Sequence, residues 1–138
     1  MECDLENITV HYEVFGEGRP FLALHGLPLD HRCQVSALEP NFERRPGWER
    51  LYPDLPGMGK TPGASWIVND DQVLAVVLDF IDHLIPGERF VIAGQSSGGY
   101  LAQGVVYHRA EMVDGLLLIP AGLVIHSQME THDNQSRR

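Results

Sequence analysis

Three short apolar segments constrain the fold of this chain more than any other feature of its sequence. They are PFLALHG (Pro20–Gly26), RFVIAG (Arg89–Gly94) and DGLLLIPAG (Asp114–Gly122). Near-continuous apolar runs of this length are typical of strands buried on both faces, as in a parallel sheet covered by helices. Helical patterns separate them, so the sequence predicts βαβ units: an α/β fold, with a mainly parallel sheet and flanking helices.

The rest of the chain supplies the other predicted elements. Ile8–Gly18 is rich in β-branched and aromatic residues and predicts a strand, in a hairpin with the residues before it. A further short strand is expected to end at Asp54. Helices are expected within Asp30–Phe42, within Asp70–Ile85 and over Ser97–Ala110. The second of these has the clearest pattern, with apolar residues at helical spacing on one face.

The start of that helix has its own signal. Asn69 can cap the first turn, and Gln72, three residues later, can complete a capping box. The pair Pro86–Gly87 then ends the pattern.

Length and charge limit the functions open to the chain. Its 138 residues suit one domain, expected over 1–122, with a polar and poorly ordered tail over 123–138. The net charge of −9 argues against binding to nucleic acid or to an anionic membrane. Cys3 and Cys33 have no metal-ligand spacing, and the first residues lack a signal-peptide pattern. We therefore expect a cytoplasmic protein with no metal and no organic cofactor.

The pentapeptide GQSSG (Gly94–Gly98) lies where a predicted strand runs directly into a predicted helix. In such a nucleophile elbow, the central serine sits on a strained turn with its hydroxyl exposed above the sheet edge. Ser96 is thus the candidate nucleophile. The small residues Gly94 and Gly98 let the strand and the helix approach closely. The N–H of Ser97 would face a developing oxyanion. A small-residue turn with only a packing role is the alternative.

Three motifs in order, FLALHGLP, DLPGMGKT and VIAGQSSGG, resemble those of the α/β-hydrolase superfamily, especially its esterase-like, haloperoxidase-like and aminopeptidase-like members. The resemblance covers roughly Ile8–Gly122. It implies that Ser96 is the nucleophile and that the N–H groups of Leu27 and Ser97 form the oxyanion hole. It also implies that His25 shapes the oxyanion loop and that Asp54 is a structural hydrogen-bonding residue.

In that family the acid and the histidine of the triad follow the serine, usually after the seventh and eighth strands. Only six strands are expected here, so we expect a hydrolase fold that is truncated after about the sixth strand, without its triad acid and base. His108 lies about 18 Å along the helix from Ser96, too far to act as its base. His126 and His132, in the tail, are the only histidines expected to be free to move toward it. His11, His31 and His83 are expected on the surface or in loops.

The first hypothesis is a serine hydrolase that cleaves an ester, amide or related acyl bond in a small-molecule substrate. Transfer of the acyl group, instead of hydrolysis, is open as well. The alternative is an inactive hydrolase fragment or binding module whose exposed sixth strand promotes self-association. In a further alternative, this strand pairs with a second polypeptide that carries the missing half. Nucleotide binding by GKT is rejected, because Asp54 stands where a phosphate-binding loop needs its first glycine.

Overall fold

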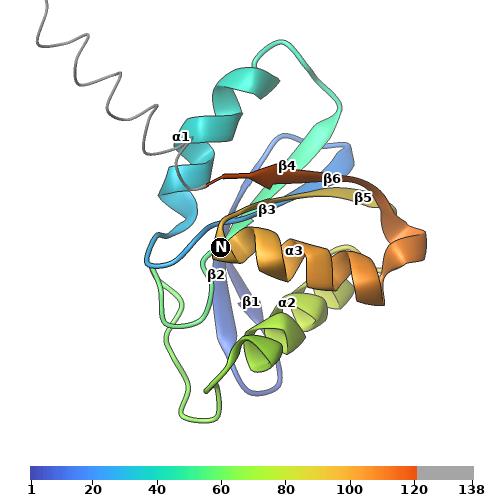
Figure 1. Cartoon of the computed structure of the whole chain (residues 1–138). Coiled ribbons are helices and arrows are strands. Elements are labelled where there is room, and N and C mark those ends of the chain that lie inside the picture. Colours follow the sequence, from blue (N-terminus) through green and yellow to red (C-terminus); the bar gives the residue numbers. More distant parts are fainter. Residues whose placement is uncertain (121–138) are drawn as a thin grey trace, which may run out of the picture.

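The computed structural model describes residues 1–120, which form one sheet with helices on both faces (Figure 1). A short 3₁₀ turn, Ala110–Met112, precedes the last strand. In chain order the elements are β1 (Glu2–Asp4), β2 (Thr9–Phe15), β3 (Arg19–Leu24), α1 (His31–Phe42), β4 (Trp48–Pro53), α2 (Asp70–Leu84), β5 (Phe90–Gln95), α3 (Ser97–His108) and β6 (Val113–Ile119).

The sheet has the strand order β1-β2-β4-β3-β5-β6. β1 and β2 pair antiparallel, and β2 pairs antiparallel with β4. From β4 onward all pairs are parallel, with Leu22 opposite both Leu51 of β4 and Ile92 of β5. The carboxyl ends of β3, β4 and β5 therefore meet at one edge, and the loops after them share that edge.

Each face of the sheet buries its own apolar cluster. On one face, α2 and α3 cover alternate strand residues such as Leu22, Leu24 and Ile92. On the other face, α1 covers Phe21 and Ala23 together with neighbouring residues. Figure 1 shows α1 on one side of the strands and α2 and α3 on the other. Because both faces are covered, β3 and β5 are apolar at all but one position each, and this accounts for their near-continuous runs.

The expected elements are confirmed, including the β1–β2 hairpin and the sixth strand that ends the described part. The capping box of α2 is also present, with Asn69 and Gln72 bonded to each other's backbone N–H groups. Two expectations for histidines are wrong. His11 lies inside β2 and is only 9% exposed, and the side chain of His31, at the start of α1, is only 12% exposed. Within residues 1–120 no helix is long and apolar enough to cross a membrane.

Candidate functional site

Ser96 occupies the turn between β5 and α3 and has unusual backbone geometry. Its φ is 52° and its ψ is −117°, and among residues 1–120 no other non-glycine residue has a positive φ. A side chain in this region costs on the order of 1–3 kcal/mol, so the surrounding structure must hold it there. The Ser96 N–H donates to the Ile119 carbonyl at 3.1 Å, and the Ser96 carbonyl accepts from Gly99 and Tyr100 at the start of α3. The residue is exposed at the sheet edge.

Two glycines permit this turn, as expected from the sequence. A Cβ atom on Gly94 would lie 2.3 Å from the carbonyl oxygen of Gly98. A Cβ atom on Gly98 would lie 2.4 Å from the Leu24 carbonyl oxygen and 2.5 Å from that of His25. These are backbone atoms that cannot move aside. The start of α3 is thus packed directly against the ends of β5 and β3.

Leu27 and Ser97, the two residues expected to supply oxyanion N–H groups, lie side by side. The Leu27 N–H donates to the Ser97 Oγ at 2.9 Å. Gly26 lies against the elbow as well, since a Cβ on it would be 3.4 Å from the Ser96 Cβ. The loop after β3 and the turn after β5 are therefore packed against each other. In this structure the Leu27 N–H is thus occupied by the Ser97 hydroxyl.

His25 is fully buried and has a structural role. Its Nε2 accepts from the Leu55 N–H at 2.9 Å, and its Nδ1 lies 2.9 Å from the Gly26 carbonyl. An acceptor at Nε2 and a donor at Nδ1 define the neutral ring with its proton on Nδ1. Burial lowers the pKa of His25, and the Gly26 carbonyl only partly opposes this effect. The neutral ring joins the loop that carries Leu27 to the loop after β4.

Asp54 follows β4 and is a second structural anchor. Its Oδ1 accepts from both the backbone N–H and the ring Nδ1 of His31 at 2.8 Å, and its Oδ2 accepts from the Lys60 N–H at 2.9 Å. Burial raises the pKa of Asp54, but these hydrogen bonds and the nearby His31 outweigh burial and hold the pKa below its usual range. The carboxylate is fully occupied by neighbours within its own loop and α1.

In the described part of the chain, Ser96 has no hydrogen-bonded side chain that could act as its base. Within residues 1–120, no histidine or carboxylate is hydrogen-bonded to the Ser96 side chain. His108 ends α3, at the opposite end of the helix from Ser96. Asp114 lies at the start of β6, where Arg19 and Arg89 bind it. His126 and His132 lie outside the described residues.

One pair of residues behind the elbow has no counterpart among the sequence predictions. The buried Gln95 side chain accepts from the Gln34 Nε2 at 3.1 Å and from the Cys33 Sγ at 3.7 Å. This contact links the last residue of β5, next to Ser96, to helix α1. No local pattern could have indicated it, because the partners are far apart in the sequence.

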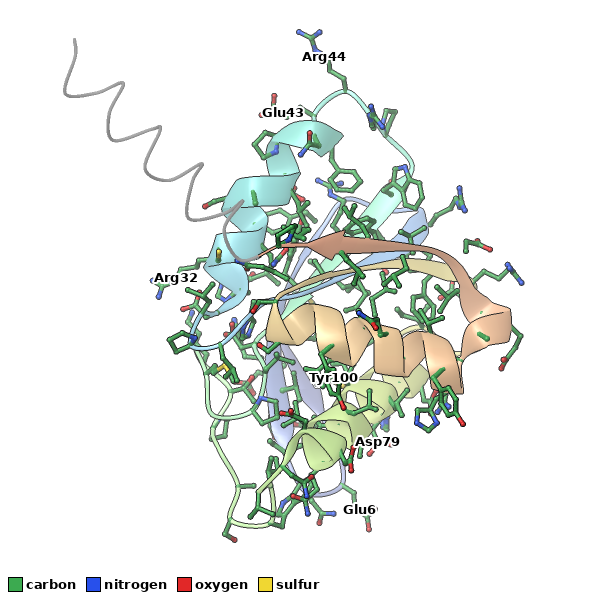
Figure 2. The ribbon with its side chains drawn as sticks, viewed as in Figure 1. Glu6, Arg32, Glu43, Arg44, Asp79 and Tyr100 are labelled. Atoms are coloured by element: carbon green, nitrogen blue, oxygen red, sulfur yellow. The ribbon has the colours of Figure 1, made fainter. Side chains whose placement is uncertain are left out.

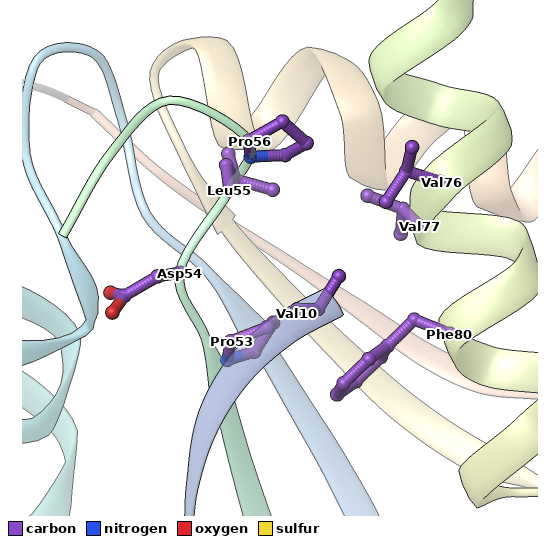
Figure 3. A pocket seen from close by; sticks show the side chains of 8 residues that line it. All are labelled: Val10, Pro53, Asp54, Leu55, Pro56, Val76, Val77 and Phe80. Atoms are coloured by element: carbon purple, nitrogen blue, oxygen red, sulfur yellow. The ribbon is translucent and has the colours of Figure 1, made fainter. Parts of the chain in front are cut away.

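An apolar pocket lies on the same side of the sheet as α2, away from the elbow. Its lining residues are Val10, Pro53, Asp54, Leu55, Pro56, Val76, Val77 and Phe80. Figure 3 shows that the Asp54 side chain lies at the margin of this pocket. None of the three candidate site residues lines it. The elbow therefore lies outside this pocket.

Comparison with known proteins identifies relatives of this chain and its fold. The sequence model of a family described as "Alpha/beta hydrolase family" matches residues 21–134. The AB hydrolase superfamily protein YisY of Bacillus subtilis is 30% identical over 117 residues, which are 84% of this chain and 42% of that protein. Haloalkane dehalogenase 2 of Mycobacterium bovis is 31% identical over 113 residues, 79% of this chain and 37% of the relative.

A solved structure agrees with the two sequence relatives. The crystal structure of an alpha/beta superfamily hydrolase from Oenococcus oeni PSU-1 matches with a TM-score of 0.75 and 35% identity, over 86% of this chain and 43% of that one. The chain thus spans about two fifths of the length of the relatives it matches. Its six-stranded, mostly parallel sheet is consistent with a hydrolase fold truncated after the sixth strand.

Proposed function

This chain belongs to the alpha/beta hydrolase family, and from that premise we propose that it carries the nucleophile and oxyanion site of a serine hydrolase. The observation that carries the proposal is the geometry of Ser96. An exposed serine holds a strained, positive-φ conformation between β5 and α3, and the hydroxyl of the next residue, Ser97, accepts from the N–H of Leu27. Strain of this kind persists only where the surrounding structure maintains it, and such residues cluster at active sites.

The proposed reaction is cleavage of an ester, amide or related acyl bond. The Ser96 Oγ attacks the acyl carbon, a new C–O bond forms, and the carbonyl electrons move to the oxygen. The N–H groups of Leu27 and Ser97 stabilise that oxyanion. Its collapse expels the alcohol or amine, which takes the proton that Ser96 has given to a base. Water then releases the acid from the acyl-enzyme.

The base and its acid partner are the open part of this proposal. A serine hydroxyl is a weak nucleophile near neutral pH without a base. Since residues 1–120 offer none, the proposal places the base outside them, at His126 or His132 or on a second polypeptide. An oxyanion site without a base still supplies a small residual acceleration over water.

The substrate class rests on the chemistry of the site. A serine beside two N–H donors suits attack on a carbonyl, where negative charge develops on oxygen. The names of the relatives span different reactions, among them dehalogenation and esterase activity toward a pimeloyl-carrier-protein methyl ester. Each of those activities belongs to the relative concerned. Acyl transfer to an acceptor other than water stays within the same chemistry.

The test combines turnover of p-nitrophenyl acetate with labelling by a fluorophosphonate probe, in the full chain. We expect Ser96→Ala to abolish labelling and to lower turnover at least about 100-fold. Ser36→Ala, on the exposed face of α1, is the matched control and keeps both activities. Circular dichroism of all three proteins verifies that the fold is retained.

Equal and negligible activity in the wild type and Ser96→Ala would contradict the proposal for this chain. That result would favour the alternative of an inactive fragment or binding module, which the length of the relatives supports. If turnover depends on Ser96, His126→Gln and His132→Gln identify the base. Activity that appears only after a second polypeptide is added would assign the base to that partner.

A further inference from the structure

Two histidines and two carboxylates from three parts of the chain come together in the folded structure. His11 Nε2 lies 3.0 Å from Glu13 Oε1, and the rings of His11 and His31 lie 5.6 Å apart between centroids. The potential ligand atoms of His11, Glu13 and His31 all lie within 4.8 Å of one another. Asp54 bonds to the ring of His31 at 2.8 Å.

The fold explains why these side chains meet. His11 and Glu13 are two positions apart on β2, so both point to one face of the strand. β2 pairs with β4 such that the Asp54 N–H donates to the His11 carbonyl at 2.9 Å. Asp54 in turn holds the first residue of α1. Figure 3 shows its carboxylate directed away from the apolar pocket and toward the ribbon of α1.

We propose that His11, Glu13 and His31 bind a zinc ion, with Asp54 orienting the ring of His31. Imidazole nitrogen and carboxylate oxygen are common zinc ligands, at about 2.0–2.2 Å from the metal. Two such atoms at a tetrahedral angle lie roughly 3.3 Å apart. The 3.0 Å between His11 and Glu13 is a hydrogen bond and is close to that value, so a zinc ion would replace the shared proton and the exposed Glu13 carboxylate would shift to bind beside the ring.

The contact with Asp54 decides which nitrogen of His31 is free. Its Nδ1 faces the carboxylate and carries the proton, which leaves the Nε2 lone pair for the metal. In zinc sites, the ring nitrogen of a histidine that does not bind the metal usually donates a hydrogen bond to a carboxylate, which orients the ring. Asp54 is itself held by the Lys60 N–H, so the ring orientation is set before any ion binds.

The types of ligand atom at this site indicate which metal ion it would bind. Two imidazoles and one carboxylate suit zinc and neighbouring transition metals, whereas magnesium and calcium prefer six or more oxygen ligands. Three protein ligands leave a fourth position open to water. The side chain of Glu13 is 37% exposed, which gives the ion a route from solvent, and the net charge of −9 favours a cation. The sequence predicted no metal site. Glu13 and His31 are too far apart in the sequence to form a recognisable metal-ligand spacing, so the sequence alone could not suggest this proposed site.

The test is calorimetric titration of the purified, untagged full chain with zinc chloride after removal of metal by a chelator. We expect one equivalent to bind with a Kd at or below about 1 µM and the melting temperature to rise. Glu13→Gln and His31→Gln should each weaken binding at least tenfold, and Asp54→Asn about 10–100-fold. Magnesium chloride should produce no heat of binding.

Two exposed residues supply matched controls. Glu6→Gln, in the turn between β1 and β2 (Figure 2), and His83→Gln, on α2, should bind zinc as the wild type does. Circular dichroism without zinc verifies folding, and Glu13→Gln, at the rim of the site, decides the outcome if His31→Gln does not fold. No binding by the wild type, or equal binding by wild type and Glu13→Gln, would overturn the proposal. In the second case the tail histidines would be the next substitutions.

Discussion

At the residue scale, His25 and Ser96 show how single positions depend on their surroundings. Ser96 keeps a conformation that most residues avoid, because its N–H and carbonyl are both bonded and glycines leave room around it. His25 keeps a neutral ring because it is fully buried between Gly26 and Leu55. Its two bonds hold the loop that carries Leu27, so its protonation state bears on the proposed oxyanion site.

This burial predicts a pH dependence of stability. The pKa of His25 is lowered from its usual 6.5 in the folded chain, so the unfolded chain binds the proton first as the pH falls. Since the unfolded state then binds more protons, the contribution of His25 is complete above about 6.5 and falls as the pH drops below it. We expect urea unfolding, with a chelator present, to show a lower free energy of unfolding at pH 5.5 than at pH 7.5.

His25→Gln should be less stable than the wild type but should lose part of this slope. His83→Gln, which removes an exposed histidine, should keep the full slope. If His25→Gln and the wild type had the same slope over this range, the pH dependence would arise elsewhere.

At the element scale, the helices begin in different ways. The Asn69 side chain accepts from the Gln72 N–H at 3.1 Å, and the Gln72 Oε1 accepts from the Asn69 N–H at 3.2 Å. Asp70 and Asp71 add negative charge where the helix dipole favours it. Helix α3 instead begins at Ser97, and its N-cap residue Ser96 makes no side-chain capping hydrogen bond. Two of the first N–H groups of α3, those of Gly99 and Tyr100, donate to the Ser96 carbonyl.

The cap of α2 predicts a defined loss of stability. Asn69→Ala removes an acceptor for the Gln72 N–H and should lower the free energy of unfolding by about 1 kcal/mol. Urea denaturation followed by circular dichroism measures it. Gln103→Ala, at an exposed position of α3, should change the free energy by less than about 0.5 kcal/mol. A loss in Asn69→Ala no larger than in Gln103→Ala would contradict this account of the cap.

At the scale of the whole molecule, the sheet ends at β6 in the described part of the chain. There β6 pairs with β5 alone, and Leu116, Leu117 and Leu118 are 41%, 47% and 46% exposed. Three consecutive exposed leucines place apolar surface on both faces of an edge strand. An edge of this kind offers unpaired backbone groups and apolar area to another chain.

This edge predicts self-association of the full chain. Burying one leucine contributes about 1.5–3 kcal/mol, which corresponds to roughly a tenfold or greater change in the dissociation constant. Leu117→Lys should weaken association by at least that factor in sedimentation velocity. Tyr107→Lys changes a more exposed apolar residue on α3 and should leave association unchanged. A wild type that stays monomeric at all concentrations would refute the prediction.

The local features of this protein were predictable from its sequence because each depends on neighbours along the chain. Apolar runs indicated the buried strands, the Asn69 and Gln72 pair indicated the start of α2, and GQSSG indicated a strand-to-helix turn at Ser96. The resemblance of three motifs to the α/β-hydrolase superfamily was confirmed by the family match. The roles of Ser96, Leu27 and Ser97 stay predictions for the experiments above.

The tertiary structure alone decided which distant residues meet. The strand order, the contact of Leu27 with Ser97, the Gln34–Gln95 pair and the cluster around His31 each join segments that are far apart in sequence. Local periodicity carries no information about such pairs. They are set by the register of the sheet, which depends on how both of its faces bury apolar surface at once.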